Sequence, residues 1–64
     1  MANADCQEAC GQAYRASVGQ CVKVLEDCLA NARSPQEEEQ CKTRFKACMA
    51  LAKRAYDLCL EECS

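Results

Sequence analysis

The eight cysteines of this 64-residue chain are spaced as a palindrome, and this spacing limits the possible folds more than any other feature. Outward from a centre between Ser34 and Pro35, successive cysteines on both arms are separated by the same intervals of seven, eleven and four residues. In an antiparallel hairpin, residues whose numbers add to a constant lie opposite each other. A chain that folds back at this centre therefore pairs its cysteines as Cys6–Cys63, Cys10–Cys59, Cys21–Cys48 and Cys28–Cys41.

Each arm is predicted to be one α-helix, the first running to about Arg33 and the second from Pro35 to about Cys63. At 100° per residue, the four cysteines of each arm fall within a sector of about 60° around the helix axis. Two glycines weaken the first helix by roughly 1 kcal/mol each, but a break there would not preserve the phase of the cysteines. We therefore expect an all-α antiparallel two-helix hairpin with four nested disulfides, forming a single domain over residues 1–64.

The turn between the arms carries the sequence pattern of a helix start. Ser34 is expected to be the N-cap, Pro35 occupies the first turn and Glu37 follows at the third position of a capping box. Proline disfavours helical geometry in the residue before it, so the first helix must stop by Ser34 and the turn is short. At the start of the first arm, Asn3 or Asp5 is expected to cap the helix.

A chain of this size buries too little apolar surface to fold without cross-links, so its cysteines are expected to form either disulfides or a thiolate metal site. The metal alternative rests on two pairs spaced i, i+4, whose thiolates would bind Cu(I) or Zn²⁺. Those candidate ligands are Cys6, Cys10, Cys59 and Cys63. Disulfides require equal spacing on the two arms and a metal store does not. We therefore expect disulfides, with no metal or other cofactor.

Other features of the sequence narrow the function by exclusion. The chain has no histidine and no Cys-x-x-Cys, which removes the usual nucleophile pairs and the usual dithiol redox motif, so we expect no enzymatic activity. A net charge of −2 and a pI near 5.0 give no attraction to nucleic acid. No apolar run has the roughly 18 residues of a transmembrane segment. Disulfides indicate an oxidising compartment, so the protein is expected to be secreted or periplasmic, with the mitochondrial intermembrane space as the alternative.

Eight large apolar residues are predicted to share one broad side of the hairpin, and we call this side the aromatic face because it holds all three aromatic residues. It consists of Tyr14, Val18, Leu25, Leu29, Phe45, Met49, Tyr56 and Leu60. The other side, which we call the opposite face, is less apolar, although it includes Leu51 and Leu58. Two helices cannot cover eight such residues, so we expect the aromatic face to bind a protein partner or a second copy that completes a four-helix bundle. The alternative is partial burial, with Tyr14 and Phe45 filling the space between the helices.

Between the disulfides, the same numbering rule sets further residues of the two helices opposite each other, and large side chains are expected to pair with small ones. Such pairing lets the helix axes approach closely enough for bridges, whose Cα atoms must lie about 5.5–6 Å apart. The predicted pairs are Val24 with Phe45, Ser17 with Ala52 and Tyr14 with Ala55.

The Cys-x3-Cys motifs at Cys6/Cys10 and Cys59/Cys63, one on each arm with nested pairing, resemble those of the plant α-hairpinins. Four nested bridges also resemble the helical-hairpin neurotoxins of marine worms. Both resemblances concern architecture over the whole length and imply a toxin-like, antimicrobial or protease-inhibitory hairpin. Inhibitory members present a basic residue in an exposed loop, the place that Arg33 occupies here.

The spacers Cys10-x10-Cys21 and Cys48-x10-Cys59 are similar to those of the twin Cys-x9-Cys proteins, although each is one residue longer. This resemblance implies the intermembrane-space alternative. From the residues themselves, the leading hypothesis is a small, non-catalytic, disulfide-rich interaction protein. A thiolate metal-binding protein and a toxin-like effector are the alternatives.

Overall fold

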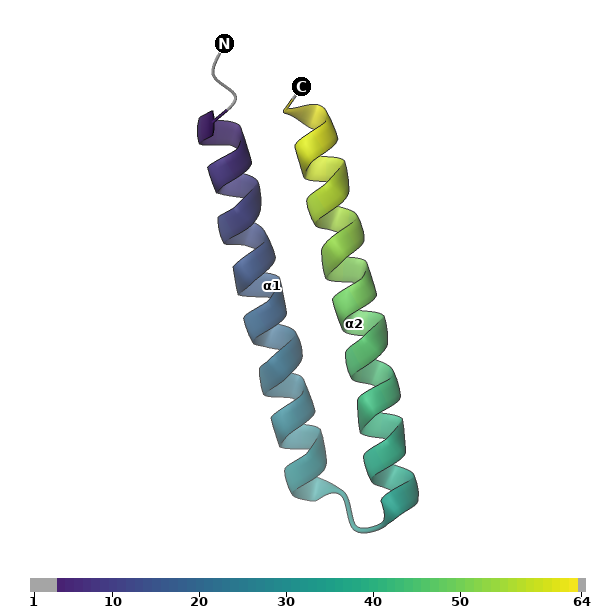
Figure 1. The fold of residues 1–64 in the computed structure, drawn as a ribbon. Helices are drawn as coiled ribbons and strands as arrows, with labels where there is room; N and C mark the ends of the chain where they lie inside the picture. Colours follow the sequence, from purple (N-terminus) through teal and green to yellow (C-terminus); the bar gives the residue numbers. More distant parts are fainter. Residues whose placement is uncertain (1–3, 64) are drawn as a thin grey trace.

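The computed structural model describes residues 4–63 and consists of two long helices side by side (Figure 1). Helix α1 spans Ala4–Asn31 and helix α2 spans Pro35–Glu62, with 28 residues in each. They run antiparallel, so the two ends of the chain lie at one end of the hairpin and the turn lies at the other (Figure 1). The predicted all-α antiparallel hairpin is confirmed. Helix α1 is continuous through both of its glycines.

All four predicted disulfides are present and nested. They join Cys6–Cys63, Cys10–Cys59, Cys21–Cys48 and Cys28–Cys41. The Cα atoms of the bridged residues lie between 5.7 and 5.8 Å apart in every case, so the two helix axes stay at a nearly constant distance along the hairpin. No cysteine remains free.

The turn occupies residues 32–34, and the N-cap of α2 is Ser34, as predicted. The Ser34 hydroxyl accepts a hydrogen bond from the Glu37 N–H at 3.1 Å. The Glu37 carboxylate accepts from the N–H of Arg33 at 3.0 Å, so the capping box closes one residue before the N-cap. Helix α1 stops at Asn31, two residues earlier than expected, because the chain needs three residues to reverse before Pro35.

At the other end of the hairpin, α1 begins at Ala4, so Asp5 lies in its first turn and is not the N-cap. Asn3, the other candidate for that cap, lies outside the described residues.

Very little of the hairpin is fully buried. Among the described residues, the buried ones are Cys10, Cys21, Cys41, Ala52 and Cys63. No leucine, valine, methionine or aromatic side chain among residues 4–63 belongs to this core. The Cα atoms extend over 53 × 14 × 8 Å, so the molecule is only two helices wide and one helix thick. The space between the helices holds sulfur and small side chains, and the larger apolar groups lie over its two edges.

One of the predicted cross-helix pairs differs in the structure, and another has an additional partner. Tyr14 and Ala55 line the same small hollow, and the Tyr14 ring also packs against Tyr56. The Val24 side chain is 58% exposed, which indicates that it does not pack between the helices against Phe45. The two residues lie at the same height, but Val24 falls about 40° to one side of the line of cysteines and Phe45 about 40° to the other. They therefore belong to opposite faces.

Candidate functional site

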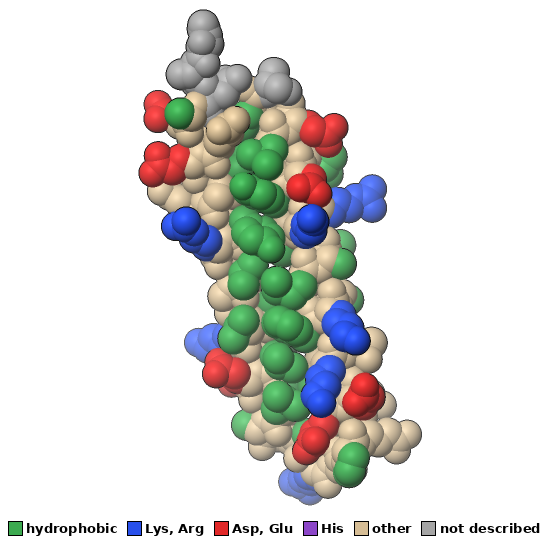
Figure 2. Space-filling view, viewed as in Figure 1, with side chains coloured by type: hydrophobic (Ala, Val, Ile, Leu, Met, Phe, Trp, Pro, Cys, Tyr) green, Lys and Arg blue, Asp and Glu red, His purple; other side chains and the backbone are tan. Residues whose placement is uncertain are grey.

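One broad side of the hairpin carries an apolar strip along the line where the helices meet (Figure 2). Figure 2 shows one broad side of the hairpin, with hydrophobic side chains running along its length and charged side chains on both flanks. Of the eight residues assigned to the aromatic face, Leu29 is 37% exposed and the other seven are half-buried. The face is therefore partly covered by its own packing, yet none of its residues is removed from solvent.

The centre of this packing is an aromatic pair. The ring centroids of Tyr14 and Tyr56 lie 4.9 Å apart with the ring planes tilted by 34°. Beneath the pair is a small hollow of about 50 Å³, lined partly by Ser17 and Ala52, the small residues that the numbering rule sets opposite each other. The tyrosines thus bridge the helices on the surface, between the Cys10–Cys59 and Cys21–Cys48 disulfides, where small residues leave the interior unfilled.

The opposite face carries the most exposed apolar side chains. Val24, Leu51 and Leu58 are 58%, 69% and 53% exposed. Sequence reasoning considered this side the less apolar one because it counted residues. Both leucines point about 80–100° away from the cysteine line of α2. Leu60 points equally far from that line on the aromatic face and is half-buried there, so the angle on the helical wheel does not by itself set the exposure.

Charges are arranged unevenly beside the aromatic face. Lys42, Lys46 and Lys53 lie along the outer flank of α2 and are all exposed, and Asp57 follows them toward the open end of the hairpin. Glu38 and Glu39 precede the lysines at the turn end of α2, so this flank is basic in its middle and acidic at both ends. Surface charges of this kind contribute little to stability, but they influence which surfaces approach each other and in what orientation.

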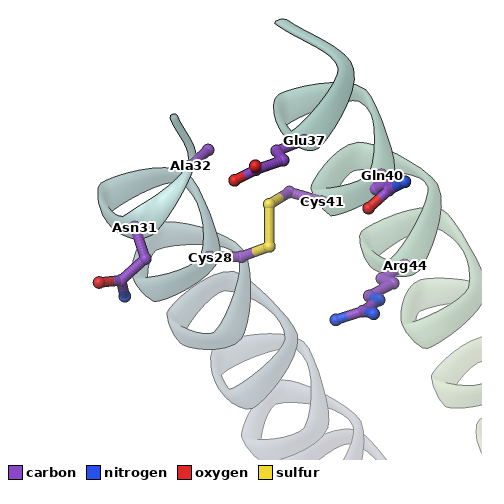
Figure 3. A pocket seen from close by; sticks show the side chains of 7 residues that line it. All are labelled: Cys28, Asn31, Ala32, Glu37, Gln40, Cys41 and Arg44. Atoms are coloured by element: carbon purple, nitrogen blue, oxygen red, sulfur yellow. A yellow bond between two sulfur atoms is a disulfide. The ribbon is translucent and has the colours of Figure 1, made fainter. Parts of the chain in front are cut away.

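A hollow of about 380 Å³ lies beside the Cys28–Cys41 disulfide, next to the turn (Figure 3). The Asn31 amide points away from α2 and donates to the carbonyl of Asp27 at 2.8 Å (Figure 3). The Glu37 carboxylate is already engaged by the Arg33 N–H. Two of the polar side chains that line this hollow, Asn31 and Glu37, thus serve the end of α1 and the turn.

At the open end, two disulfides are in contact with each other. The Sγ atoms of Cys10 and Cys63, which belong to different bridges, lie 3.6 Å apart. Both sulfurs are bonded to another sulfur and carry no hydrogen, so this is a contact between bridges and not a hydrogen bond. The Sγ atoms of Cys6, Cys10 and Cys63 all lie within 4.8 Å of one another. Three of the four cysteines of the metal alternative are therefore grouped here as members of disulfides, and Cys59, which is bonded to Cys10, lies outside this group.

Comparisons of the chain with protein-family models, with curated proteins and with solved structures return no match. The resemblance to cysteine-stapled helical hairpins therefore holds as architecture: two helices and four nested bridges. Within residues 4–63, neither helix is long and apolar enough to cross a membrane. The function has to be argued from the surface of the hairpin itself.

Proposed function

We propose that this protein is a non-catalytic interaction protein that uses the aromatic face to bind another helical surface, in the simplest case a second copy of the chain. The observation that carries the proposal is that no large apolar side chain among the described residues is buried. The disulfides hold the fold together, so the eight large residues of the aromatic face are not needed as its core. A continuous apolar strip that is not required to stabilise the fold is typical of an interaction surface.

The dimensions of the face suit a stable dimer. A side of 53 × 14 Å gives a footprint of roughly 700 Å², close to the ~800 Å² per partner of a standard interface. Two hairpins packed through their aromatic faces would form a four-helix bundle, in which half-buried residues such as Leu25 and Phe45 become the core. A disulfide-braced hairpin also loses little conformational entropy on binding, which favours affinity.

The charges on α2 favour a second copy in an antiparallel orientation. A two-fold axis near Ala52, close to the middle of the hairpin, sets Lys46 of one copy opposite Asp57 of the other, and symmetry repeats the pair. Lys42 and Lys53 then lie at the edge of the bundle, where their long side chains reach solvent. Rim pairs of this kind supply orientation more than affinity.

The proposed location is an oxidising compartment, because four disulfides persist only where thiols are not kept reduced. A secreted or periplasmic protein fits this requirement, and the mitochondrial intermembrane space is the alternative. The absence of histidine and of a Cys-x-x-Cys motif supports a non-catalytic role.

The test is the oligomeric state of matched surface variants, measured by sedimentation equilibrium up to millimolar concentration. Leu25→Glu with Leu60→Glu places two charges on the aromatic face and is expected to abolish association. Leu51→Glu with Leu58→Glu makes the same chemical change on the opposite face and is expected to leave association intact. Circular dichroism and the intact mass report whether each variant keeps its helices and its four bridges.

If only Leu51→Glu with Leu58→Glu abolished the dimer, the interface would lie on the opposite face, and the assignment to the aromatic face would be wrong. A wild-type chain that stays monomeric, and that captures no native partner whose binding depends on Leu25 and Leu60, would overturn the proposal.

A further inference from the structure

The open end of the hairpin differs from the rest of the molecule in how its disulfides are spaced. Cys6 and Cys10 lie one helical turn apart on α1, and Cys59 and Cys63 lie one turn apart on α2. Each of the other two bridges is separated from its neighbours by seven or eleven residues, or roughly 10–16 Å along the helix. Two disulfides therefore lie in contact with each other only at the open end.

One distance between sulfur atoms of the two end bridges already matches a tetrahedral zinc site. With Zn–S bonds of ~2.3 Å, the edges of a tetrahedral ZnS4 centre are about 3.8 Å long. The Sγ atoms of Cys10 and Cys63 are already 3.6 Å apart in the oxidised protein. The two bonded pairs would have to separate to the same distance. Their Cα atoms are already 5.7 and 5.8 Å apart, so rotation of the cysteine side chains can supply that change while the helices stay in place.

We infer that Cys6, Cys10, Cys59 and Cys63 form a redox-gated zinc site, in which reduction of the two end disulfides by a small thiol creates four ligands for one Zn²⁺. Two thiol molecules, RSH, reduce each bridge and leave as one disulfide, RSSR, while two cysteine thiols form. Zinc then displaces the four thiol protons and binds four thiolates. The bridges Cys21–Cys48 and Cys28–Cys41 stay oxidised and keep the helices in register.

The structure provides a route by which the end bridges open first. Cys6 is the only exposed cysteine of the eight, so an external thiolate reaches its Sγ most readily and releases Cys63. The freed Cys63 thiolate is already 3.6 Å from Cys10 Sγ, so it can attack that sulfur, form a Cys10–Cys63 bridge and release Cys59 as a thiolate. Further thiol molecules then reduce this bridge and the mixed disulfide left on Cys6, so that four RSH are consumed and two RSSR leave in all. Cys63 is also the C-cap of α2, and helix ends open locally more easily than helix interiors.

The experiment titrates the four-bridge protein with reduced glutathione, with and without Zn²⁺, and blocks free thiols with an alkylating agent at each step. Peptide masses then show which cysteines are alkylated. Without metal, the four end cysteines are expected to be alkylated first, from an intermediate about 4 Da heavier than the oxidised chain, since each opened bridge adds two hydrogens. With Zn²⁺, native mass spectrometry is expected to show one zinc per chain, and those four cysteines should resist alkylation.

Two variants with six cysteines each provide the matched comparison. Cys10→Ala with Cys59→Ala removes two of the four ligands, whereas Cys21→Ala with Cys48→Ala removes a distant bridge and leaves the end cluster whole. Zinc affinity of the partly reduced protein is expected to fall more than ~100-fold in the first variant, since loss of a supporting group alone costs 10–100-fold. It is expected to be unchanged in the second.

Three results would overturn the inference. The first is opening of Cys21–Cys48 or Cys28–Cys41 before the end bridges. The second is equal zinc affinity in the two variants. The third is binding of Cu(I) by the partly reduced protein without binding of Zn²⁺, because Cu(I) does not need four tetrahedral ligands. None of these results depends on the aromatic face.

Discussion

At the residue scale, the turn shows how few groups are needed to reverse the chain. The Ser34 backbone is extended, with φ −152° and ψ 157°, which is the geometry that an N-cap followed by proline requires. Its hydroxyl accepts from the Glu37 N–H, and Glu37 in turn accepts from the Arg33 N–H. Two hydrogen bonds thus satisfy donors on both sides of the turn.

Replacing Ser34 with alanine is expected to destabilise the protein by about 0.5–2 kcal/mol, because the Glu37 N–H loses its acceptor. Guanidinium unfolding followed by circular dichroism measures this effect, and Ser34→Asp, which retains an acceptor, is the control with little change. The association of the protein should not respond to either substitution. A loss of association in Ser34→Ala or Arg33→Ala, with the fold intact, would show instead that the loop is part of a binding site.

At the scale of the helix, α1 contains two glycines that the fold does not use. Gly11 and Gly19 both lie in the helix interior, and neither has a positive φ. A Cβ atom added at either position would meet nothing within 4 Å. Glycine costs a helix interior conformational entropy, and no packing requirement offsets that cost at these two positions in the hairpin itself.

Gly11→Ala and Gly19→Ala are each expected to stabilise the protein by roughly 1 kcal/mol, and the double variant by nearly the sum, because the sites are eight residues apart. The midpoint of guanidinium unfolding reports the gain. Destabilisation by either alanine would mean that the glycine allows a close approach which the hairpin alone does not show. For example, an interface between copies could pass over that residue.

At the scale of the whole molecule, covalent bonds do the work that a packed core does in larger proteins. Among residues 4–63 the buried ones are four cysteines and one alanine, and the helices form a single layer. A disulfide typically contributes 2–4 kcal/mol, and nested bridges contribute less than their sum because each one shortens the loops that the others close. The intact hairpin should therefore be very resistant to heat and denaturant.

Full reduction of all four bridges without metal is expected to remove most of the helical signal in circular dichroism, because two isolated helices bury too little surface to remain folded. Blocking the thiols by alkylation keeps the bridges from forming again during the measurement, and the oxidised protein at the same concentration is the reference. If the reduced, metal-free chain kept its helicity and melted cooperatively above body temperature, the apolar faces would be strong enough to hold the hairpin without disulfides.

The sequence alone determined the topology, the disulfide pairing and the position of the turn. This was possible because a palindrome of cysteines, the 100° step of the helix and the geometry before Pro35 are all local or periodic properties. The same wheel placed Tyr14, Phe45 and Tyr56 on one face. The sequence therefore predicts which residues lie at the same level along the hairpin and on the same face of it.

Only the tertiary structure decided how deeply each residue lies and which atoms meet across the helices. The 58% exposure of the Val24 side chain and the packing of the Tyr14 ring against Tyr56 are two examples. The 3.6 Å contact between the Sγ atoms of Cys10 and Cys63 was also decided by the tertiary structure, because it depends on the side-chain rotamers of two neighbouring bridges. Spacing along the chain sets the order of contacts between the helices. The exposure of each side chain and the distances between sulfur atoms depend instead on the distance between the helix axes and on the side-chain rotamers. Both of these are fixed only when the two helices are packed together.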